Sequence, residues 1–167
     1  GNLVHRVLTM TYRNFDGSVP QAGDLDSASS RLLEEAGRRF GDTGANIEEC
    51  RFRAALGSAM GLAQATNRYL DQKAPWHTIK TDRTNTATTL WTALTVINCL
   101  KTAMYPFLPF SSERLHKMLG FQGSVEEQGW KWEPETVRAL QELAEPEPLF
   151  AKLDEAIVEQ ETQRIGR

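Results

Sequence analysis

Apolar residues recur at steps of three and four over the first fifteen positions, which is the spacing of one face of an α-helix. This stripe comprises Leu3, Val4, Val7, Leu8, Thr11 and Phe15. Asp16 and Gly17 follow as a turn signal, and a polar stretch continues to Gly23. The pattern therefore predicts a first helix that ends near Asp16.

Two further helices are predicted before residue 71. The first is capped by Asp26 or Ser27 and stops at Gly41, so that residues 42–46 form a linker. The second is long and spans about 47–70, because apolar side chains repeat along one of its faces. That face carries Phe52, Leu56, Ala59, Ala63, Thr66 and Leu70.

Proline and glycine divide the remainder of the chain. Pro75 excludes a continuous helix across residues 71–82, because proline lacks a backbone donor and restricts the residue before it. The next helix, about 85–104, is apolar around much of its circumference and is expected at the centre. Shorter helices are expected from Ser111 or Ser112 to Gly120, at about 135–144 and at about 153–165.

These elements predict an all-α fold, a helical bundle with appended C-terminal helices, because no segment has a convincing strand pattern. The length fits one domain over residues 1–167. We expect a core bundle at about 1–122 and a helical extension at about 123–167. Trp130 and Trp132 are expected to anchor the loop that begins the extension.

The formal net charge of −3 is not typical of a nucleic-acid binder. The acidity is localised, because residues 124–167 hold eleven acidic and five basic side chains and residues 1–123 carry a net +3. This balance fits a binder that uses a few base contacts and excludes one that depends on strong phosphate attraction. No apolar run approaches the ~18 residues of a membrane span and no secretory signal is recognisable, so a cytoplasmic protein with no membrane partner is expected.

The sequence has no motif for catalysis or metal binding, so neither a catalytic residue nor a metal site is predicted. The three histidines are scattered and are expected at the surface or its boundary. Adjacent carboxylates such as Glu34 and Glu35 diverge by about 100° on a helix, which is typical of a solvated face. Cys50 and Cys99 are expected to be reduced thiols in the core.

Two features have the chemistry to bind an unpaired base. Asn2 and Arg6 are four residues apart, so they project from one helical face and offer the donors and acceptor that base edges require. An exposed polar face is the alternative. Trp76 follows Pro75 in a basic loop, where its ring can stack on a base or pack against the end of the bundle. Asn67 is expected to have a structural role, through a side-chain hydrogen bond to the following loop.

Three stretches carry a family pattern. They are Gly-Asn-Leu-Val-His-Arg-Val at 1–7, Ala-Thr-Asn-Arg-Tyr-Leu-Asp-Gln-Lys-Ala-Pro-Trp at 65–76 and Tyr-Pro-Phe-Leu-Pro-Phe-Ser-Ser-Glu at 105–113. In this order they resemble the anticodon-binding domain of methionyl-tRNA synthetases. Parts of them are shared with other class I synthetases, whereas Ala-Pro-Trp together with the N-terminal Asn-x-x-x-Arg indicates methionine. Neither ATP signature of class I synthetases occurs in the sequence.

The resemblance implies that Asn2 and Arg6 read bases of the CAU anticodon and that Pro75 and Trp76 form the stacking surface. Weaker candidates for phosphate contacts are Arg13, Lys73 and Lys80. The implied partners are the anticodon stem-loop of tRNA(Met) and a catalytic domain of the same polypeptide that this chain lacks. ATP would be used in that domain, so no cofactor and no enzymatic activity are expected here. The alternative is a synthetase-derived protein-interaction module that has lost tRNA recognition and docks a partner through its acidic C-terminal face.

Overall fold

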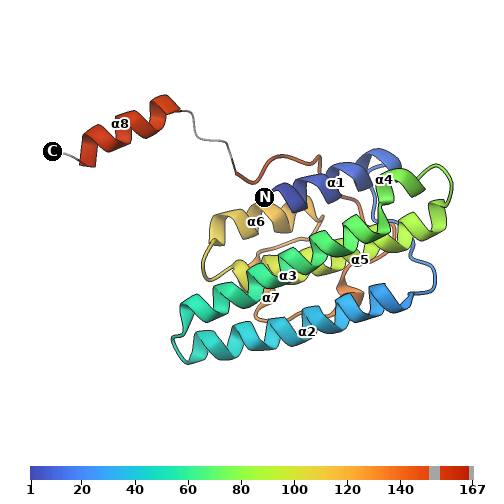
Figure 1. The fold of residues 1–167 in the computed structure, drawn as a ribbon, viewed down its shortest axis with the longest axis horizontal. Coiled ribbons are helices and arrows are strands. Elements are labelled where there is room, and N and C mark those ends of the chain that lie inside the picture. The colour runs from blue at the N-terminus through green and yellow to red at the C-terminus, as the bar shows by residue number, and fades with distance from the viewer. Residues whose placement is uncertain (151–154, 166–167) are drawn as a thin grey trace.

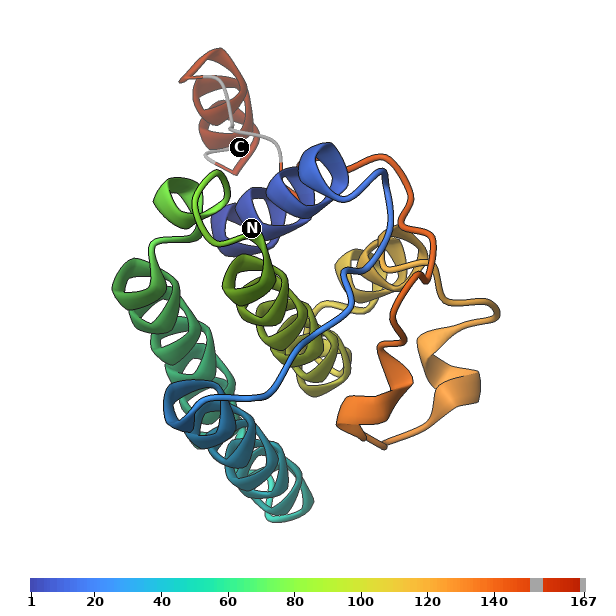
Figure 2. The ribbon, with the colours of Figure 1, turned by 90° about the vertical axis from the view of Figure 1, so that its right-hand side faces the viewer.

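The computed structural model describes residues 1–150 and 155–165, and the regular elements in these ranges are helices. They are α1 (Asn2–Asn14), α2 (Ser27–Glu48), α3 (Phe52–Lys73), α4 (Pro75–Thr78), α5 (Arg83–Met104), α6 (Pro109–Met118), α7 (Val125–Gln128), the 3-10 helix η1 (Pro134–Thr136) and α8 (Glu155–Ile165). Figure 1 shows α2 and α3 side by side, and both pack on α5. Figure 2 shows α5 at the centre, with α3 and α2 on one side, α6 on the other and α1 across the top. The predicted all-α bundle is confirmed.

Helix α5 is buried around nearly its whole circumference, as its apolar pattern predicted. Leu90, Leu94 and Ile97 are fully buried in it. Several threonines are buried beside them because their hydroxyls donate to the carbonyl four residues earlier. These pairs are Thr86 to Asp82, Thr88 to Thr84, Thr89 to Asn85 and Thr92 to Thr88. The central helix therefore satisfies these four hydroxyls internally while it supports the helices packed around it.

Helix α2 continues through Gly41 to Glu48, so the predicted stop and the linker at 42–46 are wrong. A glycine within a helix costs only about 1 kcal/mol relative to alanine. Burial of Ala36 and Thr43, on either side of that glycine, accompanies the packing of α2 on α3 and α5. The tertiary contacts therefore outweigh the local preference.

The chain reverses at Cys50, whose φ of 58° lies in the left-handed region. Helix α3 consequently begins at Phe52 and not near residue 47. Phe52, which was predicted on the apolar face of this helix, is exposed in its first turn. Cys50 is exposed in this turn, so its prediction as a core thiol is wrong. Cys99 is buried as predicted, and burial raises the pKa of its thiol.

The helix predicted at 135–144 is wrong. Its residues form η1 and an irregular stretch that is bridged to the loop after α1, between Ser18 and Glu142. The indole N–H groups of Trp132 and Trp91 donate to backbone carbonyls of α5 and of this stretch, at 3.1 and 3.0 Å. The Val137 carbonyl of this stretch is thus satisfied by Trp91, a partner distant in sequence, where a helix would have paired it locally. Trp132 is an anchor, as predicted.

The start of one further helix differs from prediction. Helix α6 begins with Pro109 and has no side-chain cap, because proline suits a first helical position whose N–H would be unpaired. Of the helix predicted at 153–165, α8 covers all but the first two residues, which lie outside the described ranges. The boundary between a core at 1–122 and an extension stays a prediction. Among the described helices, none combines the length and hydropathy that crossing a bilayer requires.

Candidate nucleic-acid interface

Trp76 lies where α3 gives way to the short helix α4. Helix α3 ends at Lys73, and the next residue, Ala74, has a left-handed φ of 44° that redirects the chain so that α4 starts with Pro75. Pro75 is buried at the first helical position, where its fixed φ is favourable. The next residue, Trp76, remains 41% exposed. The proline therefore fixes the backbone, and the tryptophan presents part of its ring to solvent.

Arg6 of α1 lies against this ring. Its guanidinium carbon is 5.4 Å from the centroid of the Trp76 ring, a cation–π contact. Residues six and seventy-six are thus brought together by the packing of α1 near the end of α3. The structure joins two of the four residues predicted to read the anticodon.

Two side chains of α3 also contact Arg6. Its Nη2 donates to Oδ1 of Asn67 at 3.2 Å, and its Nη1 is 3.9 Å from Oδ1 of Asp71. Asn67 is itself oriented, because its Nδ2 donates to the Ala63 carbonyl at 3.1 Å. The Arg6 side chain is 39% exposed, so the guanidinium is held in one place while part of it remains accessible.

Asn67 is a residue whose importance the sequence did not indicate. Its predicted hydrogen bond to the following loop is wrong, because its Nδ2 donates to the Ala63 carbonyl in the preceding turn of α3 and its Oδ1 accepts from Arg6. Asn67 and Arg6 are sixty-one positions apart, and the helical periodicity of neither α1 nor α3 indicates that they meet. Asn2 lies one helical turn before Arg6 on α1 and is exposed. Asn2 therefore presents an exposed side-chain amide one turn from the Arg6 guanidinium.

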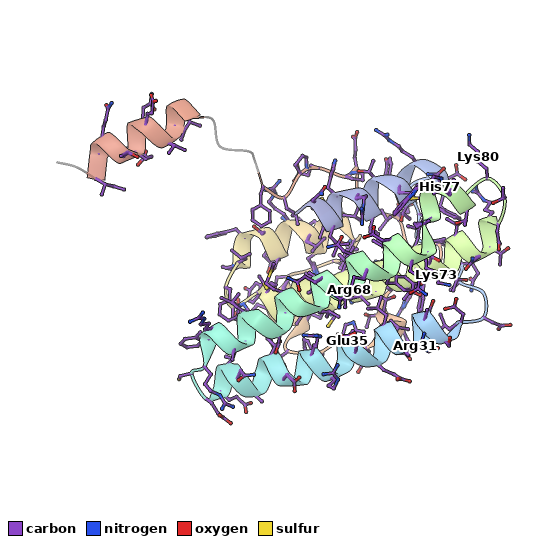
Figure 3. The ribbon with its side chains drawn as sticks, in the orientation of Figure 1. Arg31, Glu35, Arg68, Lys73, His77 and Lys80 are labelled. Atoms are coloured by element: carbon purple, nitrogen blue, oxygen red, sulfur yellow. The ribbon has the colours of Figure 1, made fainter. Side chains whose placement is uncertain are left out.

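The three predicted phosphate contacts differ in their surroundings. The Lys73 ammonium donates to the Asp26 carboxylate, and its side chain is only 13% exposed. This hydrogen bond from Lys73 is the main reason that the pKa of Asp26 falls to about 2. Lys73 is thus engaged with the cap of α2. Arg13 and Lys80 are exposed, and Figure 3 shows Lys80 beyond α4 at this end of the bundle.

We call the surface formed by Asn2, Arg6, Asn67, Pro75 and Trp76 the corner site. It combines a half-exposed indole with a held guanidinium and an amide, which are groups that stack on bases and hydrogen-bond to their edges. It contains no carboxylate dyad of the kind that acid–base catalysis uses. In the described part of the chain, no cluster of three histidine, cysteine or carboxylate side chains could hold a metal ion.

A second polar cluster lies in the core and joins α5, α6 and α7. The Lys101 ammonium donates to Oε1 of Gln128 at 2.6 Å and lies 3.0 Å from Nδ1 of His116. Nε2 of His116 is 3.1 Å from the Gln122 carbonyl, so it is the protonated nitrogen and Nδ1 accepts from Lys101. Burial lowers the pKa of Lys101 to about 8 and also lowers the pKa of His116. His116 is only 2% exposed, so its predicted surface or boundary position is wrong.

Comparisons with known proteins agree on one family. The family described as "Anticodon binding domain of methionyl tRNA ligase" matches residues 19–167. The methionine–tRNA ligase of Dehalococcoides mccartyi (strain 195) is 47% identical over 99% of the chain, and that of Thermomicrobium roseum is 40% identical over 99%. The chain spans 30% and 32% of the lengths of these relatives. The crystal structure of the apo form of Mycobacterium tuberculosis methionyl-tRNA synthetase has the same fold, with a TM-score of 0.82 at 24% identity over 92% of this chain and 32% of that one.

Proposed function

The chain belongs to the family of anticodon-binding domains of methionyl-tRNA ligases, and on this premise we propose that it recognises the CAU anticodon loop of tRNA(Met). The observation that carries the proposal is the contact between the Arg6 guanidinium and the Trp76 ring, 5.4 Å apart. A base reader needs a flat surface for an unstacked base and donors beside it. The corner site supplies both.

Each residue of the corner site has a role in this proposal. Trp76 stacks on an unpaired anticodon base, and the guanidinium of Arg6 gives forked donors to the acceptors of a neighbouring base. Asn2, one turn away, offers a second set of donors and an acceptor. Because the guanidinium is already held by Asn67, little conformational entropy is lost when a base binds.

The charge of the chain favours recognition by such placed side chains. Residues 1–123 are only mildly basic, so phosphate attraction alone contributes little affinity. Arg13 and Lys80 are proposed as phosphate contacts that orient the loop. Lys73 is a weaker choice, because binding a phosphate would compete with its bond to Asp26.

The parent activity is proposed to be ATP-dependent ligation of methionine to tRNA. The curated relatives are about three times as long as this chain, and we assign the methionine and ATP sites to the remainder of such a polypeptide. That remainder is the proposed covalent partner. On this proposal the present chain supplies recognition and no reacting group.

Substitution of Trp76 by alanine tests the proposal. We expect binding of a labelled CAU stem-loop to weaken by about 1–3 kcal/mol, or roughly 5- to 160-fold, because a stacked base is lost. The melting temperature should change little. Trp130 is the matched control, since it is 42% exposed but stacks on Phe40, so its replacement by alanine should lower stability and leave RNA affinity unchanged. Equal RNA affinities for the Trp76 variant and the wild type would contradict the stacking role.

The alternative function, a protein-interaction module that has lost tRNA recognition, makes a different prediction. Such a module binds no stem-loop, even at low salt where electrostatic attraction is strongest. The same titration therefore distinguishes the two functions.

A further inference from the structure

The structure assigns a second RNA contact, outside the corner site, to the groove between α2 and α3. We propose that Arg31 and Arg68, which line this groove, bind backbone phosphates of the RNA whose loop occupies the corner site. The groove, which we call the arginine groove, has a volume of about 250 Å³. The proposal rests on the proposed function for the identity of the RNA.

Both arginines are available to an anion. Arg31 and Arg68 are exposed, and in the described part of the chain neither takes part in an ion pair or a side-chain hydrogen bond. Glu35 also lines the groove, but its carboxylate accepts from Nε of Arg39 at 2.7 Å. The acidic charge of the groove is therefore already paired, and the two guanidinium groups remain in excess.

Guanidinium groups match phosphate better than other basic groups do, because their planar fork donates two parallel hydrogen bonds. The two arginines come from different helices, so a phosphate strand in the groove would be held from both walls. Leu32 and Ala65 also line the groove, and their side chains offer no group that would compete with a phosphate for the guanidinium donors. This chemistry fits a phosphodiester backbone.

The position of the arginine groove fits an RNA that starts at the corner site. Figure 3 shows Arg31 and Arg68 on neighbouring stretches of α2 and α3, with Lys73 nearer to α4 and Lys80 beyond it. Arg68 lies five residues before the end of α3, which is about 8 Å at 1.5 Å per residue. Successive phosphates of one duplex strand are separated by only a few ångströms along the axis, so a strand leaving the corner reaches the groove within a few nucleotides.

Phosphate contacts carry no sequence information, and this separates the groove from the corner site. Loss of both arginines should weaken binding of every hairpin alike and leave the ratio of affinities for CAU and scrambled loops unchanged. Two phosphate contacts fewer should also reduce the slope of log affinity against log salt by about 1.4 to 1.8.

The test compares the double variant Arg31→Gln/Arg68→Gln with the wild type in salt titrations of fluorescence anisotropy, using the CAU and the scrambled hairpin. The matched control is Arg38→Gln/Arg53→Gln, which removes one exposed arginine from each of the same helices outside the groove. We expect the smaller slope in the first variant only. Uncharged methylphosphonate linkages in the stem should reproduce the loss in the wild type and add little in the variant.

An unchanged slope in the groove variant, or an equal change in the control, would overturn the proposal and leave the arginines to an acidic protein partner. A wild type that binds both hairpins equally would contradict the proposed anticodon recognition, yet the slopes on either hairpin would still decide the role of the groove. Absence of binding to any hairpin would overturn both.

Discussion

Replacement of Asn67 by alanine isolates the contact that holds Arg6 in the corner site. The variant removes the Oδ1 acceptor at 3.2 Å, and the guanidinium keeps only the Asp71 carboxylate at 3.9 Å as a polar partner on α3. Asp71 is 65% exposed, and exposed ion pairs contribute only about 0–1 kcal/mol. The variant therefore leaves Arg6 in place but allows its side chain to adopt other rotamers.

The size of the effect follows from these contacts. A hydrogen bond to a charged group contributes about 1.5–3 kcal/mol when it is well shielded. The Arg6 side chain is 39% exposed and the bond is long, so the lower end applies after screening. We expect the affinity for the CAU stem-loop to fall by about 1–1.5 kcal/mol, or roughly 5- to 12-fold. The preference for CAU over a scrambled anticodon should shrink by a similar factor.

Anisotropy titrations of both hairpins measure this change, and thermal melting measures stability in parallel. Asn46 provides the control, because its Nδ2 donates to the Asp42 carbonyl four residues earlier, as Nδ2 of Asn67 does to Ala63. Asn46→Ala removes the same intrahelical bond far from Arg6 and should leave RNA binding unchanged. If Asn67→Ala kept wild-type affinity and preference, or if Asn46→Ala lost as much, the positioning of Arg6 by Asn67 would be refuted.

Two further predictions concern stability. Gly120 has a φ of +81°, and a Cβ built there would lie 1.9 Å from the Glu142 carbonyl oxygen. Gly120→Ala should therefore destabilise the fold by more than about 2 kcal/mol in urea denaturation. Gly57 lies in open space on α3, so Gly57→Ala should stabilise the fold by up to about 1 kcal/mol. Equal midpoints for the two variants would contradict this difference. The pKa of Lys101 is about 8 in the fold and near 10.5 when unfolded, so between pH 8 and 10 this group binds more protons in the unfolded chain and its contribution to stability rises with pH. Burial raises the pKa of the Cys99 thiol, which opposes this rise above about pH 9 in both proteins, so the wild type should gain stability relative to Lys101→Met as the pH rises from 8 to 10. Denaturation of the two proteins across this range measures the difference; an identical pH dependence would be the contrary result.

The helical pattern predicted most of the bundle because burial follows the same periodicity. Leu3, Val4, Val7 and Leu8 form the buried face of α1, and α5 is central as its composition indicated. The helix predictions were wrong where contacts between residues distant in sequence outweighed local helix preferences. Gly41 is an effective stop only in a helix without tertiary packing, and α2 is packed on both α3 and α5. The stretch at 135–144 lost its expected helix to pairing with a loop more than a hundred residues earlier.

The residue types of the corner site could be predicted from the sequence, whereas the contacts between their side chains could not. Arg6 and Trp76 were singled out by residue type, but their contact depends on how α1 packs near the end of α3. The hold of Asn67 on Arg6 and the engagement of Lys73 by Asp26 are side-chain pairs between separate helices or their caps. No periodicity within one helix specifies such partners, so only a three-dimensional structure reveals them.

Anticodon recognition by the wild-type chain is tested most directly by its affinity for a labelled CAU stem-loop compared with the same stem carrying a scrambled anticodon. Because base-edge contacts at Asn2 and Arg6 are expected to carry the specificity, we predict tighter binding of CAU by at least about fivefold, since one lost base contact costs about 1–3 kcal/mol. Equal affinities for the two hairpins would contradict anticodon recognition by this domain.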